Sequence, residues 1–578
     1  MGRKHPGRVQ QARQFFSLKL NEEAKENYLS AISAGEALSC QDYNQLAEIL
    51  INSGEIREAC CCYELSLEKH QHQIHIIHNL GYAYLLLGDL KKAIVNLKIA
   101  ADSEPENSLF HFNLGSALAQ AKYRQEAITE FHQAIELDPE NENAYAALGE
   151  VLNAENRPRE AERAFQACAI IKPLSANAQL NLSTHLLNEE KFAAAIEPAK
   201  QAIRLNPNLA IAHCNLAKAL QETRSTEEAI HAAREGLKIN EHSPALWITL
   251  YAISIMSGQH HDAEDAIQRA FQLAPKNNDV RYNYGRHCLR KEDFTNGWFH
   301  YKARWQTNQK IWNNPFSRAM SQLQEWIGEP TNKALIAWPE QGIGDEIMFN
   351  SCIQDIYSLA SNLTIVSDDR LIELHKHSFS PKIEFIGKNE ALKKLSHFDL
   401  QVAMGNATGY VRPSKETFKT AARGYLQADP TRIEELRDQL GIEGQDHAIG
   451  ISWSSKGSKK FNTQKCMSPL EIIQLSAHPH ATFISLEYQD CTEAINKLKA
   501  ESQVKIIDTA CLHLFDDINT LAALIALCDE VVTVSNVNAH LAGALGVECT
   551  VVTRNHDWRW GSMGTQCYWY DSVSLLRQ

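Results

Sequence analysis

The sequence predicts a helical repeat array, forming a superhelix, followed by an α/β region with two parallel sheets. Three observations support this fold class. A leucine returns at a 34-residue step through the first half, the helical pattern gives way to short apolar strands near residue 331, and a second series of strands follows residue 441. These changes divide the chain into an N-terminal tail with capping helices (1–39), the array (40–311), a linker (312–330), a first lobe (331–440) and a second lobe (441–578).

Three residue types mark the repeat. The recurring leucines are Leu46, Leu80, Leu114, Leu148, Leu182, Leu216 and Leu250, and thirteen residues after them stand Ala59, Ala93, Ala127, Ala161, Ala195, Ala229 and Ala263. Most units end in proline, at Pro105, Pro139, Pro173, Pro207 and Pro275. This pattern resembles the tetratricopeptide repeat, a helix–turn–helix unit. Because one helix pair cannot bury its apolar face alone, the units are expected to stack.

The last unit, 294–305, is distorted and is followed by a cluster of tryptophans. Trp298, Trp305, Trp312 and Trp326 lie close together in the sequence. We expect them to cap the array against the region that follows; the alternative is that they stack on a sugar.

Short apolar strands alternate with helical segments from residue 331 onward. The predicted strands are 334–338, 363–367, 382–387 and 398–404, and then 447–453, 481–487, 504–508, 531–535 and 548–553. This alternation is typical of parallel sheets, and the two series predict two Rossmann-like lobes. Ligands in such folds bind at the carboxyl ends of the strands.

Residues 290–578 resemble the heptosyltransferase-like GT-B glycosyltransferases that carry N-terminal tetratricopeptide repeats. The resemblance rests on the runs 340-EQGIGD, 450-GISWSS, 539-AHLAGALG and 557-DWRWG, in this order. It implies a metal-independent, inverting transfer of a sugar from a nucleotide-sugar donor. It also implies that Asp345 is the general base that takes the proton of the acceptor hydroxyl. The alternative is that Asp345 only stabilises the first turn of a helix.

The resemblance assigns donor binding to the second lobe, at Ser454, Ser455, Lys456, Lys465, Glu487, Asn536, Asn538 and His540. The amides at the start of the helix after residue 535 are suited to a diphosphate, with Ser535 or Asn536 as N-cap. The family has an acid where this chain has Ser535, which opens the alternative of altered donor choice or lost activity. The alternative for Lys456 and Lys465 is that they lie in a solvent-exposed loop without a ligand. Glu487 stands at the position where the family uses an acid to contact the ribose of the nucleotide.

Asparagine precedes the repeat leucine in five units, at Asn79, Asn113, Asn181, Asn215 and Asn283. These amides resemble the asparagine ladder of the repeat-bearing O-linked N-acetylglucosamine transferases, which implies a protein or peptide acceptor held through its backbone. The alternative is that asparagine bonds a neighbouring helix.

Composition narrows the function classes. The net charge of −13 argues against a broad nucleic-acid surface, and no apolar run is long enough for a membrane span. Fourteen cysteines without a signal peptide predict reduced thiols in a cytoplasm. We expect no metal site and no resident cofactor. The leading hypothesis is therefore a glycosyltransferase; the alternatives are a non-catalytic scaffold and a nucleotide-regulated adaptor.

Overall fold

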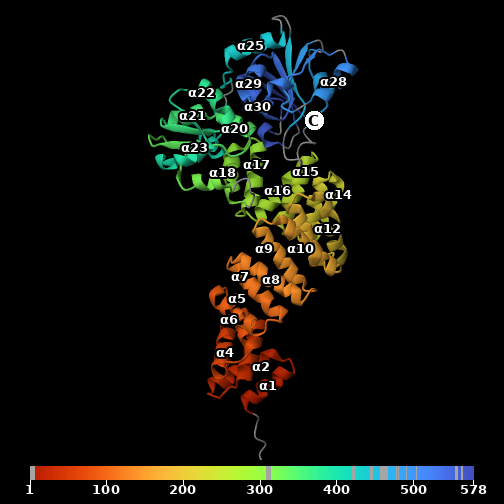
Figure 1. Cartoon of the computed structure of the whole chain (residues 1–578), viewed down its shortest axis with the longest axis vertical. Helices are drawn as coiled ribbons and strands as arrows, with labels where there is room; N and C mark the ends of the chain where they lie inside the picture. Colours follow the sequence, from red (N-terminus) through yellow and green to blue (C-terminus); the bar gives the residue numbers. More distant parts are fainter. Residues whose placement is uncertain are drawn as a thin grey trace, which may run out of the picture. The chain divides into compact units, whose positions relative to one another are not determined.

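The computed structural model describes residues 7–307, 314–418, 424–442, 447–455, 466–476, 478, 481–489, 491–502, 504–553, 557–561 and 564–577. The chain forms two compact units, Met1–Ile239 and Asn240–Gln578 (Figure 1).

The first unit is made of helices that pack in consecutive pairs (Figure 1). Its helices are α1 (Arg8–Ser17), α2 (Asn21–Ser33), α3 (Cys40–Asn52), α4 (Ile56–Lys69), α5 (Ile74–Leu87), α6 (Leu90–Ser103), α7 (Ser108–Gln120), α8 (Arg124–Leu137), α9 (Glu142–Ala154), α10 (Pro158–Ile171), α11 (Ala176–Asn188), α12 (Phe192–Leu205), α13 (Ala210–Glu222) and α14 (Thr226–Ile239). From α3 onward each pair occupies one 34-residue step, which confirms the predicted repeat.

Small residues let the paired helices approach closely. A Cβ at Gly115 would lie 2.8 Å from the Phe131 ring, and one at Gly149 would lie 2.6 Å from the Phe165 ring. Ala127 and Ala134 on α8 are fully buried. The repeat sequence thus places a large aromatic ring opposite a glycine, so the two helices pack with complementary shapes.

The second unit begins with more helices, α15 (Pro244–Met256), α16 (His260–Leu273), α17 (Asn278–Arg290), α18 (Phe294–Tyr301) and η1 (Lys302–Gln306). The indole N–H of Trp298 donates to the Arg412 carbonyl over 3.1 Å, and Trp326 is buried. Trp298 therefore packs the repeats onto the α/β region, as expected of a cap, whereas the Trp326 indole bonds Glu329 and its ring lies beside Tyr410, both within the first lobe. Trp312 lies outside the described residues.

The first α/β sheet is parallel, in the order β1-β5-β2-β3-β4. Its strands are β1 (Gln324–Glu325), β2 (Leu335–Trp338), β3 (Leu363–Ser367), β4 (Glu384–Gly387) and β5 (Leu400–Ala403). The segment expected to be a linker holds α19 (Pro315–Met320) and β1, which pairs with β5. Residues 314–330 therefore belong to the first lobe.

The second sheet is also parallel, in the order β11-β10-β9-β6-β7-β8. Its strands are β6 (Ala448–Ser452), β7 (Thr482–Ser485), β8 (Ile506–Ile507), β9 (Glu530–Val534), β10 (Glu548–Thr553) and β11 (Val573–Arg577). Numbered within the lobe, this is the doubly wound order 3-2-1-4-5-6 read from the other edge, with its switch point between β6 and β9. All nine predicted strands are present, and β1 and β11 are additional.

Helices cover both faces of each sheet. They are α20 (Ile343–Asn350), α21 (Ile353–Leu359), η2 (Asp369–Leu371), α22 (Ile372–Ser378), α23 (Lys388–Lys393), η3 (Leu395–His397), α24 (Met404–Val411) and η4 (Lys415–Phe418) around the first sheet. Around the second are α25 (Pro430–Leu440), α27 (Pro469–Gln474), α28 (Thr492–Glu501), η5 (Ala510–Leu512), α29 (Ile518–Ala526), α30 (Val537–Leu545) and η6 (Trp558–Trp560). This two-sided cover explains why every residue of β2, β3, β5, β6 and β7 is buried.

Among the helices described, none is both long and apolar enough to cross a membrane. All fourteen cysteines are free thiols.

Candidate functional site

The starts of two helices meet in the second unit, each just beyond the carboxyl end of a strand. Helix α20 begins after β2, and α30 begins after β9. A Cβ at Gly344 would lie 3.2 Å from Cδ2 of His540 and 3.9 Å from Cα of Val537. The glycine in the 342-GIGD run therefore permits this close approach between the two lobes.

Asp345 lies in the first turn of α20 and forms a two-pronged ion pair with Arg559. Nη2 of Arg559 is 2.8 Å from Oδ2 of Asp345, and Nε contacts Oδ1. Asp557 lies 3.1 Å from Nη1 of the same guanidinium, and Oε1 of Gln341 lies 3.1 Å from Nη2. Burial alone would lower the pKa of Arg559, but the charges of Asp345 and Asp557 outweigh burial and raise it well above its usual value.

Arg559 is a site residue that sequence reasoning missed. It lies in the 557-DWRWG run between Trp558 and Trp560, which are both buried.

His540 and Ser535 lie beside this ion pair and contact the same C-terminal segment. The His540 ring stacks on Trp560 at 4.7 Å between centroids, and Nδ1 is 3.1 Å from the Tyr570 hydroxyl. The Trp560 indole donates to Ser535 Oγ over 2.8 Å. Ser535 Oγ in turn lies 3.4 Å from a carboxylate oxygen of Asp557, so an acid is present next to Ser535.

Side-chain amides and hydroxyls form a hydrogen-bond network at the switch point between β6 and β9. Asn536 is the N-cap of α30, accepting from the backbone N–H of Asn538 over 3.0 Å. Its amide donates to Ser452 Oγ (3.0 Å) and to the Ser454 carbonyl (2.8 Å). The Asn538 amide donates to Ser452 Oγ (2.9 Å) and to the Leu486 carbonyl (3.0 Å). These bonds tie the strand ends β6, β7 and β9 together.

Two residues predicted to contact the donor lie beneath the surface. Asn538 is 0% exposed and Glu487 is 4% exposed. The Glu487 carboxylate accepts from the backbone N–H groups of Trp453 (2.7 Å) and Ser454 (2.8 Å), and from the Ser454 hydroxyl. Glu487 thus holds the loop after β6, and it also lines a hollow at the carboxyl ends of β7 and β8. Donor contact of Glu487 and Asn538 stays a prediction. Ser455 is partly exposed at that loop, and Lys456 and Lys465 lie outside the described residues.

A hollow of 420 Å³ opens at the carboxyl ends of β7 and β8. Tyr488 and Phe515 line it, with ring centroids 6.0 Å apart, and Phe515 is exposed. This is the side of a doubly wound sheet where the nucleoside part of a dinucleotide lies.

A second hollow, of 490 Å³, lies beside the first sheet. Trp305 and Trp338 line it, with ring centroids 5.1 Å apart, together with Lys302 and Arg318. Trp305 thus stays available for the sugar-stacking alternative. No group of three or more His, Cys, Asp or Glu side chains within the described ranges could hold a metal ion.

A buried polar chain lies under α20. The Ser367 hydroxyl donates to Glu346 Oε1 over 2.6 Å, and Nδ1 of His375 lies 2.8 Å from Ser367 Oγ. Nε2 of His375 is 3.2 Å from the Asn350 amide nitrogen. Burial raises the pKa of Glu346 to about 7 and lowers the pKa of His375 to about 3.

The repeat asparagines do not form one exposed row. Asn113 (7% exposed) places its amide 2.8 Å from Nε2 of His78, and Asn215 (5% exposed) donates to Thr184 Oγ1 over 2.9 Å. Both partners belong to the preceding repeat, which favours the neighbouring-helix alternative for these two residues; their contact with an acceptor stays a prediction. Asn79 contacts His78, the Asn283 amide donates to the Asp279 carbonyl of its own helix, and Asn181 is partly exposed.

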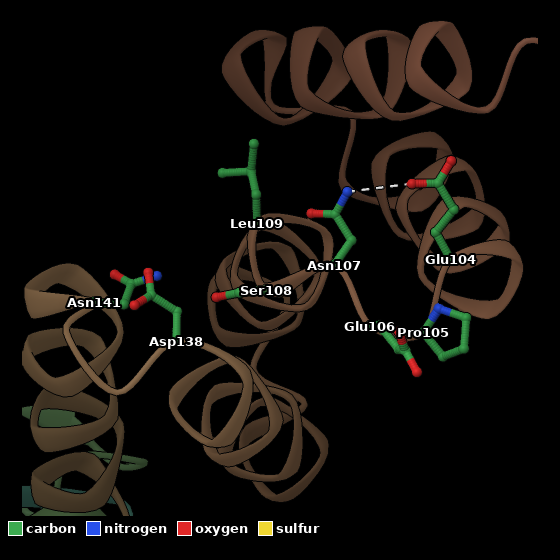
Figure 2. A pocket seen from close by; sticks show the side chains of 8 residues that line it. All are labelled: Glu104, Pro105, Glu106, Asn107, Ser108, Leu109, Asp138 and Asn141. Atoms are coloured by element: carbon green, nitrogen blue, oxygen red, sulfur yellow. Dashed lines mark hydrogen bonds between the residues drawn. The ribbon is translucent and has the colours of Figure 1, made fainter.

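The first unit carries an acidic hollow of 780 Å³ between two inter-helix turns (Figure 2). Glu104, Glu106 and Asp138 line it beside the exposed Leu109. Asn107 donates to Glu104 over 3.3 Å and orients that carboxylate (Figure 2).

Comparison with known proteins identifies the repeats. Three family models described as tetratricopeptide repeat match residues 74–107, 108–141 and 180–244. These segments are tetratricopeptide repeats. Protein FlbA of Caulobacter vibrioides is 31% identical over 268 residues, covering 43% of this chain. The chain spans 44% of FlbA, less than half of that relative's length.

Similar solved structures cover only part of the chain. YrrB, titled a TPR protein with an unusual peptide-binding site, is 17% identical with a TM-score of 0.28, covering 32% of this chain and 95% of YrrB. PilF of Pseudomonas aeruginosa is 20% identical with a TM-score of 0.32, covering 36% and 95%. A repeat protein of Parabacteroides merdae is 14% identical with a TM-score of 0.35, covering 42% and 96%.

Proposed function

We propose that this protein is an inverting, metal-independent glycosyltransferase whose two α/β lobes form a GT-B arrangement. The observation that carries the proposal is the convergence of Asp345, Arg559 and the start of α30 beside the switch point of a doubly wound sheet. A carboxylate for the acceptor and a cation for phosphate are the two groups that such a transfer requires.

In the proposed reaction, an acceptor hydroxyl attacks the anomeric carbon of a nucleotide sugar. The hydroxyl proton passes to Asp345, the new oxygen–carbon bond forms, and the bond from that carbon to the phosphate oxygen breaks. The nucleoside diphosphate leaves with the electron pair, and Arg559 with the first-turn amides of α30 stabilises its charge.

The nucleoside end of the donor is assigned to the 420 Å³ hollow, where Tyr488 and Phe515 offer aromatic faces to a base. The tetratricopeptide repeats are proposed to hold a protein acceptor. The acidic hollow of Figure 2 favours an acceptor segment with basic residues. A cytoplasmic location is part of the proposal and is supported by the free thiols.

A thermal-shift panel of nucleoside diphosphates and nucleotide sugars tests the donor site. A ligand that binds the folded state at about 100 times its Kd stabilises it by about 2.7 kcal/mol. We expect one nucleotide class to raise the melting temperature reported by tryptophan fluorescence. All ten tryptophans follow residue 239, so this signal reports on the second unit alone.

A non-catalytic scaffold is the second candidate function. It is favoured by the engagement of Asp345, Glu487 and Asn538 with other protein groups. A flat response to every nucleotide in the panel would support the scaffold over the enzyme.

A further inference from the structure

Arg559 is held by a group that a donor phosphate could replace. Its guanidinium makes a two-pronged contact with Asp345, which lies 214 residues away in sequence. The Arg559 side chain is 21% exposed, whereas that of Asp345 is 10% exposed. The cation is therefore within reach of a ligand while its ion pair is intact.

A planar guanidinium binds carboxylate and phosphate through the same forked geometry. In this structure the Asp345 carboxylate occupies one such fork, at the point where α20 and α30 begin. Asp557 is only two residues from Arg559 and also N-caps η6, so it belongs to the arginine's own segment. Asp345 and Gln341 are the partners that come from the opposite lobe, and of the two only Asp345 carries a charge.

We propose that the Asp345–Arg559 ion pair is an exchangeable latch that couples donor binding to activation of the base. The donor diphosphate takes Arg559 from Asp345, and the released carboxylate then serves the acceptor. This inference rests on the proposed function and adds the order of events.

The exchange changes which atoms of Asp345 are available to the acceptor. While the ion pair is intact, both carboxylate oxygens contact the Arg559 guanidinium. Once a phosphate takes the cation, these oxygens are released and can accept the hydrogen of the acceptor hydroxyl. The acceptor hydroxyl is then deprotonated only when a leaving group is in place.

Removing the charge of Asp345 should strengthen diphosphate binding. In the Asp345→Asn variant Arg559 is no longer held, so the binding-competent fraction rises and the apparent Kd falls, on the order of tenfold. Isothermal titration of the full chain with ADP, GDP, UDP, CDP and inorganic pyrophosphate measures this. Glu373→Gln is the charge-matched control: Glu373 is on α22, pairs with Lys376 and should leave the affinity unchanged.

The Arg559→Gln variant, alone and combined with Asp345→Asn, completes a double-mutant cycle. It should weaken binding about tenfold or more, and in its background Asp345→Asn should no longer improve the affinity. If the parent binds a diphosphate and Asp345→Asn binds it equally or less tightly, the latch is overturned while the donor site stands. If neither the parent nor Asp345→Asn binds any probe, both the latch and the proposed function fail. Should Asp345→Asn not fold, an unchanged affinity in Arg559→Gln alone overturns the latch, and a weakened one supports it.

Discussion

At the residue scale, the buried chain under α20 fixes one proton arrangement. The Asn350 amide donates to Nε2 of His375, so the proton of this neutral histidine is on Nδ1 and donates to Ser367. The Ser367 hydroxyl is then directed at Glu346. A charged His375 would carry a proton on Nε2 as well, and that proton would face the N–H of Asn350. This hydrogen-bond series therefore requires uncharged His375, in agreement with the lowered pKa of that residue.

Glu346 should make the protein less stable as pH rises. Its folded pKa of about 7 exceeds its usual value of 4.5, so between these values the native state holds a proton that the unfolded state has lost. The free energy of unfolding therefore falls through this window, by about 2–3 kcal/mol from about pH 5 to about pH 8. Glu346→Gln keeps the acceptor oxygen and removes the titration, so it should be more stable than the parent at the higher pH. Denaturant unfolding followed by tryptophan fluorescence measures the difference, and equal pH slopes in parent and variant would contradict it.

The residue scale also shows where prediction from sequence stopped. Asp345 was identifiable because glycines and a following amphipathic segment flag a strand–loop–helix turn. Its pairing with Arg559 was not, because a contact between positions 214 residues apart leaves no local pattern. The burial of Glu487 and Asn538 was not identifiable either, because it depends on three strand ends meeting.

At the element scale, Asn536 does more than cap a helix. Its oxygen accepts from the first turn of α30, and its amide bonds β6 and the loop after it. Asn536→Ala should cost about 1 kcal/mol for the cap and about 1–3 kcal/mol more for the buried groups left unpaired. Asn277 caps α17 in the same unit through its side-chain oxygen, so Asn277→Ala should cost only the cap. Similar losses in the two variants, measured by tryptophan fluorescence in denaturant, would mean that the extra bonds contribute nothing.

The repeat helices should resist an added methyl group where a ring faces a glycine. Alanine favours a helix over glycine by about 1 kcal/mol, but overpacking costs about 1–3 kcal/mol. At Gly149 the new Cβ would lie 2.6 Å from Phe165, so Gly149→Ala should be destabilising. In a Phe165→Leu background the same change should become neutral or stabilising. Far-UV circular dichroism during thermal unfolding tests the cycle; an unaltered cost in that background would show that the ring is not the obstacle.

Prediction from sequence was most complete for these elements. The 34-residue step was enough to predict the repeats, and nine apolar runs were enough to predict most strands. Buried parallel strands are recognisable because their apolar residues follow one another without interruption. Strand β1 was missed because its two residues are polar, and β11 because its buried residues alternate with exposed ones instead of forming a continuous apolar run. The contacts of Asn113 and Asn215 with the preceding repeat could not be predicted, because sequence position cannot tell an amide facing a groove from one facing the next helix.

On the scale of the whole molecule, the last repeats belong to the α/β core. Phe294, Trp298 and Tyr301 share one buried cluster with residues of both lobes. A fragment of residues 240–578 should therefore fold, whereas one of residues 331–578 should not. Truncating one large buried aromatic side chain lowers the free energy of unfolding by about 3–5 kcal/mol. The whole free energy of unfolding of a domain is only about 5–15 kcal/mol. Soluble yield and a cooperative fluorescence transition compare the two fragments. Cooperative unfolding of 331–578 would show that the lobes do not need the repeats.

The closure of Trp558 over Trp298 and Tyr301 has a consequence for synthesis of the chain. The ring centroids of these pairs are 6.1 Å and 5.5 Å apart, yet about 260 residues separate Trp558 from Trp298. At about 5–20 residues per second, a ribosome takes on the order of 10–50 s to make the covering tryptophan after the covered one. During that interval Trp298 and Tyr301 stay exposed on the nascent chain, because the segment that covers them has not yet been synthesised. Translation pauses and chaperone supply should therefore govern the yield of this protein more strongly than the stability of its finished fold.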